Sequence, residues 1–166
     1  MHNTAASLHS ALHFGSGIAQ DFDHSTSRQP LTNEDAQDHQ FVTMLDAYRD
    51  LGGLVRLQEV FTICKSRAGR DIASMARRIA KKDVLSFDWH AQVWIPLFQF
   101  DRDSMVVQPG FASVLAILNA NYTRWSIALW FAKPNAWLQG ATPASMLCKD
   151  AGQVLAAARA RRLSSV

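Results

Sequence analysis

Residues 130–147 read WFAKPNAWLQGATPASML, and this stretch contains the end of one helix, a turn and the start of another helix. Pro134 and Gly140 interrupt regular structure, because proline cannot continue a helix and glycine tolerates left-handed backbone. Thr142 followed by Pro143 is typical of a helix start, with threonine as N-cap and proline at the first helical position. The stretch therefore predicts a tight turn and a short apolar helix at about 143–149.

Apolar residues on both sides of this stretch recur at the three- and four-residue spacing of helices. The spacing predicts helices at about 41–51, 57–65, 71–82, 111–120, 124–132 and 152–162. Between residues 84 and 95 the apolar period shortens to two, which predicts two strands joined at His90-Ala91. In this last segment Phe87, Trp89 and Trp94 are interpreted as core residues. The expected fold is mainly α, with one short β-hairpin.

Length and composition indicate a globular protein. The chain has 166 residues, of which 48% are hydrophobic, and this is enough for a core. It contains no run of 18 apolar residues, so we expect no membrane span. Its first residues lack the basic charge and cleavage site of a secretory signal. Cys64 and Cys148 are far apart, so we expect buried thiols rather than a disulfide, and a cytoplasmic location.

Three segments differ in composition. Residues 1–38 are polar and are predicted to be a flexible tail. His9 and His13 have the spacing of helical metal ligands, but no acidic or sulfur ligand lies close by, so no metal site is expected. The segments 39–101 and 102–166 are predicted to be two separate modules. In the first, the order helix, helix, hairpin suggests a helix–turn–helix with a wing.

The middle of the chain carries most of the positive charge. Residues 42–82 contain nine basic and four acidic residues, although the net charge of the whole chain is only +3. If the apolar side chains Ile72, Met75, Ala76 and Ile79 face inward, a polar and basic set faces outward. That set is Arg70, Ser74, Arg77, Arg78, Lys81 and Lys82. It fits the phosphates and base edges of operator DNA, although a solvated basic surface is the alternative interpretation.

The stretch from Pro134-Asn135 through Leu138-x-Gly140 to Pro143-x-x-Met146-Leu147 resembles the toxin-binding domain of Xre/MbcA/ParS-type antitoxins. The resemblance covers about residues 110–160, and the preceding helices and hairpin are similar to the region before that domain in related bacterial proteins. It implies a type II antitoxin that inhibits a cognate toxin and regulates its own operon, as a homo-oligomer. The implied toxin-binding residues are Pro134, Asn135, Trp137, Leu138, Gly140, Arg159, Arg161 and Arg162.

Among these residues, Trp137 and Leu138 are the expected exposed anchors, while Trp125 and Trp130 are candidates for a homodimer face. Family partners include toxins of the RES type, which consume NAD, so the resemblance implies such a toxin. The chain departs from the family in its basic final helix, where relatives often have an acidic or glycine-terminated end.

Motifs of enzymes and of cofactor sites are missing. There is no Gly-x-Ser-x-Gly, no phosphate-binding loop and no set of cysteines and histidines with zinc spacing. His90 lies on the hairpin turn without a nucleophile beside it in the sequence, so we expect no catalytic residues, metal or cofactor. The alternative functions are a stand-alone DNA-binding transcriptional regulator without a toxin, and a structural adaptor in a larger assembly.

Overall fold

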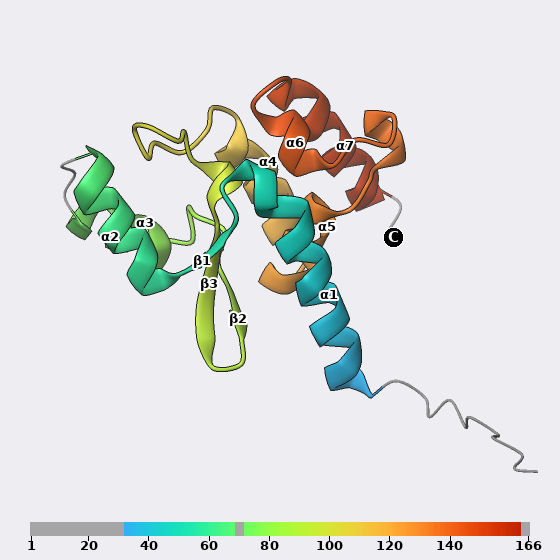
Figure 1. Cartoon of the computed structure of the whole chain (residues 1–166). Coiled ribbons are helices and arrows are strands. Elements are labelled where there is room, and N and C mark those ends of the chain that lie inside the picture. The colour runs from blue at the N-terminus through green and yellow to red at the C-terminus, as the bar shows by residue number, and fades with distance from the viewer. Residues whose placement is uncertain (1–31, 69–71, 164–166) are drawn as a thin grey trace, which may run out of the picture. The chain divides into compact units, whose positions relative to one another are not determined.

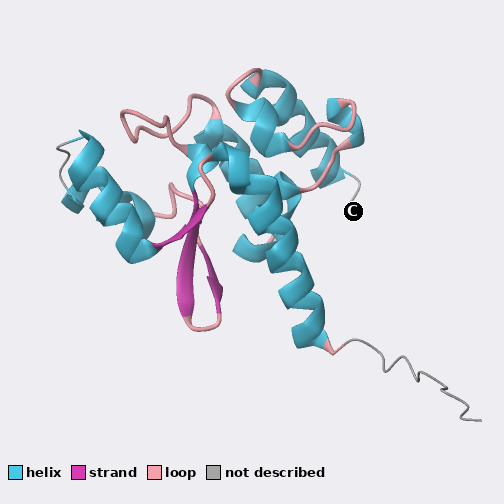
Figure 2. Cartoon of the chain, in the orientation of Figure 1, coloured by secondary structure: helices cyan, strands magenta, loops and turns pink. Residues whose placement is uncertain are grey.

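The computed structural model describes residues 32–68 and 72–163, within which it has seven α-helices and three strands (Figures 1 and 2). The prediction of a mainly α fold with a short β-hairpin is confirmed, and a third strand completes a small antiparallel sheet. The elements are α1 (Asn33–Tyr48), β1 (Leu54–Arg56), α2 (Leu57–Ala68), α3 (Ile72–Ala80), β2 (Phe87–Trp89), β3 (Gln92–Pro96), α4 (Phe111–Asn119), α5 (Arg124–Ala132), α6 (Pro143–Leu147) and α7 (Ala151–Leu163). Single 3₁₀ turns follow α1, β3 and α5, at Arg49–Leu51, Leu97–Gln99 and Ala136–Leu138.

Helix α1 begins earlier than predicted. The predicted tail 1–38 is wrong for residues 33–38, which are helical. The helix starts here because Thr32 and Asp35 form a capping box: the Asp35 backbone N–H donates to Thr32 Oγ1 at 3.1 Å, and the Thr32 N–H donates to Asp35 Oδ2 at 3.0 Å. The hydrogen bonds from Thr32 hold the pKa of Asp35 below its ordinary value. His9 and His13 lie outside the described residues.

The sheet has the strand order β1-β3-β2. The hairpin β2–β3 was predicted, whereas β1 was not, because three residues carry no measurable alternation. β1 pairs antiparallel with β3, with Leu54 opposite Pro96 and Arg56 opposite Trp94. At the hairpin tip His90 and Ala91 both have positive φ, 45° and 56°, which is the backbone of a two-residue hairpin turn that glycine or asparagine usually occupies.

A first hydrophobic cluster joins α1 and the hairpin to helices α4–α7. Of the three hairpin aromatics predicted to be core residues, Phe87 is buried in this cluster, whereas Trp89 and Trp94 are half-buried and pack against it. Phe41 stacks on Trp89 with ring centroids 3.7 Å apart. Phe131 of α5 packs against the rings of Phe98 and Phe111. The Tyr48 hydroxyl donates to the Ala128 backbone carbonyl, which ties α1 to α5. This cluster contains residues of both predicted modules, 39–101 and 102–166. The division at residue 101 stays a prediction.

A second, smaller cluster lies between α2, α3 and the sheet. Its buried members are Val60, Cys64, Met75, Val84, Ile95, Phe100 and Met105. Cys64 is buried as expected, but Cys148 is exposed, so the expectation of two buried thiols is wrong for the second one. The two clusters meet near Gln99, whose buried amide accepts from the Leu85 N–H at 2.8 Å and donates to the Leu85 and Pro96 carbonyls at 2.9 and 2.8 Å.

Helix α3 differs from its prediction in length and in orientation. It ends at Ala80 instead of Lys82, because Lys82 has φ of 60° and closes a Schellman motif: its N–H donates to the Ile79 carbonyl at 3.0 Å, and the next N–H, of Asp83, donates to the Arg78 carbonyl at 3.0 Å. Met75 is buried and Ile79 is half-buried. Ile72 is 40% exposed, and Ala76 is also exposed, so their predicted inward orientation is wrong.

Candidate functional site

The loop between α5 and α6 is held closed by its own hydrogen bonds. Asn135 Oδ1 accepts from the Trp137 N–H at 2.9 Å, and the Asn135 backbone carbonyl accepts from the N–H groups of Leu138 and Gly140, both at 3.0 Å. The Asn135 N–H in turn donates to the Ala141 carbonyl at 3.0 Å. Gln139 and Gly140 reverse the chain with φ of 54° and 85°. The sequence predicted this turn, and its closed network fixes the backbone of Trp137.

The two expected anchors of this loop have opposite environments. The Trp137 side chain is 71% exposed, as expected for an anchor. Leu138 is 3% exposed and belongs to the first hydrophobic cluster, so the expectation that it is an exposed anchor is wrong. Two adjacent residues of a 3₁₀ turn point about 120° apart, and burial of one therefore turns the other outward.

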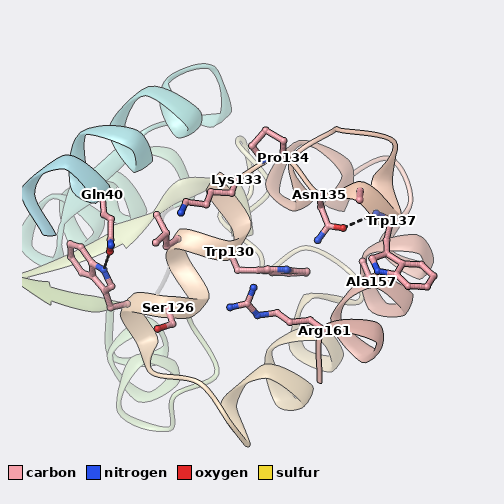
Figure 3. A pocket seen from close by; sticks show the side chains of 12 residues that line it. Gln40, Ser126, Trp130, Lys133, Pro134, Asn135, Trp137, Ala157 and Arg161 are labelled. Atoms are coloured by element: carbon pink, nitrogen blue, oxygen red, sulfur yellow. Dashed lines mark hydrogen bonds between the residues drawn. The ribbon is translucent and has the colours of Figure 1, made fainter. Parts of the chain in front are cut away.

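Trp137 lies on the wall of a groove with a volume of about 440 Å³. The groove is formed by α1, α5, the loop after α5, and α7 (Figure 3). Its lining consists of Gln40, Trp125, Ser126, Leu129, Trp130, Lys133, Pro134, Asn135, Ala136, Trp137, Ala157 and Arg161. Its volume lies in the range of about 300–1,000 Å³ that is typical of ligand sites in proteins.

Polar contacts orient the side chains around the groove. The Trp125 indole Nε1 donates to Gln40 Oε1 at 2.6 Å, which joins α5 to α1 across 85 residues of sequence. The Arg161 guanidinium lies 4.5 Å from the centre of the Tyr122 ring, and the Tyr122 hydroxyl donates to the Arg161 backbone carbonyl at 3.2 Å. Figure 3 shows the Trp130 indole in the middle of the groove and the Arg161 side chain extending from α7.

Half of the predicted toxin-binding residues are brought together here. Pro134, Asn135, Trp137 and Arg161 all line the groove. Gly140 shapes the turn beside it, and Leu138 is buried. Arg159 and Arg162 are exposed on α7 and do not line the groove. The predicted set is therefore a mixture of wall residues, structural residues and surface charges.

Sequence reasoning did not include several groove residues in the toxin-binding set. Trp125 and Trp130 were assigned to a homodimer face; the former is half-buried, the latter is buried, and both line the groove. Gln40 and Lys133 were missed altogether. Gln40 carries no local signal, because only the packing of α1 on α5 brings it to the groove. Lys133 directly precedes the Pro134-Asn135 motif, so its position in the sequence indicates that it lies close to the predicted toxin-binding residues.

The predicted DNA-binding residues lie on and after α3. Ser74, Arg77 and Arg78 are exposed on the helix, and Lys81 and Lys82 are exposed in the turn that follows it. Arg70 lies outside the described residues. The Lys82 backbone carbonyl accepts from Arg124 Nη2 at 2.9 Å, which connects the end of this basic surface to the start of α5. Partial burial lowers the pKa of the Arg124 guanidinium.

The tip of the hairpin is attached to α1. The Trp89 indole Nε1 donates to Asp38 Oδ1 at 3.2 Å, and His90 Nε2 lies 3.2 Å from the same oxygen. The Asp88 side chain is exposed. A carboxylate close to the tip is unfavourable for phosphate contact, so the exposed cations of α3 and its C-terminal turn are the better candidates for DNA contact than the hairpin tip.

Within residues 32–68 and 72–163, no group of three or more histidines, cysteines or carboxylates is placed to hold a metal ion. No helix in the same ranges is long and apolar enough to cross a membrane. No known protein family, curated protein or solved structure matches the chain significantly.

Proposed function

We propose that this protein is an antitoxin-like inhibitor of the Xre/MbcA/ParS type, which acts in the cytoplasm and captures a cognate toxin through the groove and Trp137. The observation that carries the proposal is the Trp137 side chain, 71% exposed on a loop closed by hydrogen bonds. Protein interfaces are dominated by a few aromatic and arginine anchors, and tryptophan is among the most enriched.

Rigid presentation of the anchor favours binding. An exposed tryptophan in a mobile loop loses conformational entropy when a partner immobilises it. Here the bonds between Asn135, Leu138, Gly140 and Ala141 already fix the backbone before a partner arrives. An exposed aromatic side chain also contributes about 2–4 kcal/mol to an interface when it becomes buried. These two effects support Trp137 as the central contact.

Co-expression tests the proposal. The protein encoded by the neighbouring gene should co-purify with this chain, and cells that express the neighbouring protein should grow only when this chain is also present. Trp137→Ala should abolish both the co-purification and the growth rescue. Leu163→Ala is the matched control, because Leu163 is similarly exposed, at 73%, but lies outside the groove. Normal growth of cells that express the neighbouring protein alone would contradict a toxin–antitoxin pair.

A second function, DNA binding, is favoured by the basic surface. In this proposal α2 and α3 act as a helix–turn–helix with the hairpin as a wing, either to autoregulate the operon or as a stand-alone regulator without a toxin. The exposed cations Arg77, Arg78, Lys81 and Lys82 are its support. Lysine and arginine contacts to phosphates release counterions, so the affinity should fall steeply with salt.

Salt-dependent DNA binding tests this second function. The double variant Arg77→Ala/Arg78→Ala should flatten the slope of log affinity against log salt by about 2, close to one unit for each lost phosphate contact. Lys149→Ala removes an exposed positive charge near the end of α6 and should leave the slope unchanged. Equal slopes for the native protein and the double variant would remove α3 from the DNA interface.

A further inference from the structure

We infer that the groove binds an acidic segment of the partner protein, in which an aromatic side chain lies beside one or more carboxylates. The inference rests on the proposed function, because it names the chemistry of the surface that the captured protein would offer. It assigns to Arg161 a role different from that of Arg159 and Arg162. Arg161 belongs to the wall of this protein's own groove and receives the partner's acid there.

The charge of the groove selects an anion. Its lining contains two cationic side chains, Lys133 and Arg161, and no aspartate or glutamate. They stand on different elements, the C-terminal end of α5 and the last turns of α7. Across an interface, complementary charge steers the encounter and excludes partners of the wrong sign. A segment with carboxylates therefore fits the groove, and a basic segment does not.

The remaining lining selects a flat apolar group. Trp125, Leu129 and Trp130 of α5 form one side, while Pro134 and Trp137 belong to the loop. Aromatic side chains prefer stacked or edge-to-face contact with one another, so the half-buried Trp125 and the exposed Trp137 can each receive a further ring. Arg161 already lies over the Tyr122 ring, which orients its guanidinium before any partner binds.

Polar groups at fixed positions complete the site. Ser126 and Asn135 also line the groove, and each carries a group that can donate to a carboxylate. Asn135 Oδ1 is occupied by the Trp137 N–H at 2.9 Å, which leaves the side-chain amide nitrogen directed away from that bond (Figure 3). An oligonucleotide offers phosphates and rings as well, but the four exposed cations on and after α3 suit a phosphate backbone better than the two cations of the groove.

The test uses NMR of the full-length protein with its five tryptophans, whose indole N–H signals report on separate places. The probe is the acetylated and amidated peptide Gly-Glu-Phe-Glu-Gly, and the comparison peptide is Gly-Gln-Phe-Gln-Gly. We expect the acidic peptide to shift the signals of Trp125, Trp130 and Trp137 in a saturable manner. Trp89 and Trp94, which lie in the hairpin outside the groove, should stay unchanged. The glutamine peptide should bind at least about tenfold more weakly.

Two groove variants and one control separate charge from folding. Lys133→Gln and Arg161→Gln should each weaken binding of the acidic peptide by about three- to tenfold. Arg159→Gln, which removes an exposed charge from the same helix as Arg161, should have no effect. Lys133 is exposed, so its substitution leaves the core intact even if the change at Arg161 disturbs the Tyr122 contact.

Equal binding of the two peptides, shifts only outside the groove, or tighter binding of a thymidine oligonucleotide at these tryptophans would overturn the inference. The outcome also separates it from the proposed function. If no toxin is captured but the acidic peptide binds, the proposed toxin capture fails, while the preference of the groove for an acidic segment stands. If the toxin is captured equally well by the native protein and by Lys133→Gln and Arg161→Gln, the groove inference fails while the proposed function stands.

Discussion

The two hydrophobic clusters of this protein support surfaces of opposite character. The first cluster carries a groove with aromatic walls, two cations and a rigid loop that exposes Trp137. The second, smaller cluster carries the exposed basic residues of α3 and its C-terminal turn. Fixed aromatic walls require a large rigid core behind them, whereas the basic surface requires only that its charges share one side of a helix. This comparison predicts different responses to substitution in the two regions.

The largest effect should come from the core behind the groove. Phe131→Ala should lower the free energy of unfolding by about 3–5 kcal/mol, because the ring is fully buried against Phe98 and Phe111. Met75→Ala, in the smaller cluster, should cost about 2 kcal/mol. The cost is lower because Met75 lies on α3, which is mostly exposed and can move to fill the space. Urea denaturation measures both changes. A larger loss for Met75→Ala would contradict the view that the first cluster dominates stability.

A somewhat smaller loss is expected where the clusters meet. Gln99→Met keeps the size of the side chain but leaves the Leu85 N–H and the carbonyls of Leu85 and Pro96 without their partner. Each buried backbone group that loses its partner costs about 1 kcal/mol or more, so the three groups together should cost about 3 kcal/mol. The midpoint of urea denaturation should fall accordingly. Gln58→Met, at an exposed position of α2, is the control and should change it little; equal stability of Gln99→Met and the native protein would show that water replaces the amide.

Sequence and structure agree where the signal is local. The turn at Pro134-Asn135, the cap Thr142 and the short helix that it starts were predicted, because caps and proline act on their immediate neighbours. The groove was predicted only in part, since Gln40, the α5 tryptophans and Arg161 meet through packing of segments far apart in the sequence. Burial of Leu138 beside exposed Trp137 also depends on tertiary packing.

Helix α3 also shows which features the sequence predicts and which depend on tertiary packing. Its charged residues could be read directly from the sequence, and those within the described part of the chain are exposed. Its end at Ala80 was missed, because Lys82 adopts the left-handed conformation that glycine usually marks. The inward orientation of Ile72 and Ala76 was overestimated, because an ideal helical stripe assumes a partner along its whole length, and the second cluster contacts only part of α3.

A moderate effect is expected at the caps on the groove side. Thr142→Ala removes the side-chain oxygen that accepts from the Ser145 N–H at 3.2 Å and should destabilise the protein by about 1 kcal/mol. Thr62→Ala, in α2, removes only a bond from an exposed hydroxyl to the Gln58 carbonyl at 3.2 Å and should stay within about 0.5 kcal/mol. Thermal unfolding compares the two variants. Equal melting temperatures of the two variants would mean that the Thr142 cap of α6 does not contribute to the stability of the protein.

The smallest effect on stability should occur at the proposed anchor. Trp137→Ala should change the free energy of unfolding by less than about 0.5 kcal/mol, because most of the side chain faces solvent. Urea denaturation of the isolated protein provides the measurement. A loss above about 2 kcal/mol would reassign Trp137 from the partner surface to the core.

Calorimetric titration of the purified neighbouring-gene product tests the central claim most directly, with the native chain, Trp137→Ala and Arg77→Ala/Arg78→Ala compared side by side. If the groove side captures the partner, Trp137→Ala should weaken binding by at least about 30-fold, or about 2 kcal/mol. The arginine variant should bind as tightly as the native chain. The same dissociation constant for Trp137→Ala and the native chain, or weakening only by the arginine variant, would contradict the account.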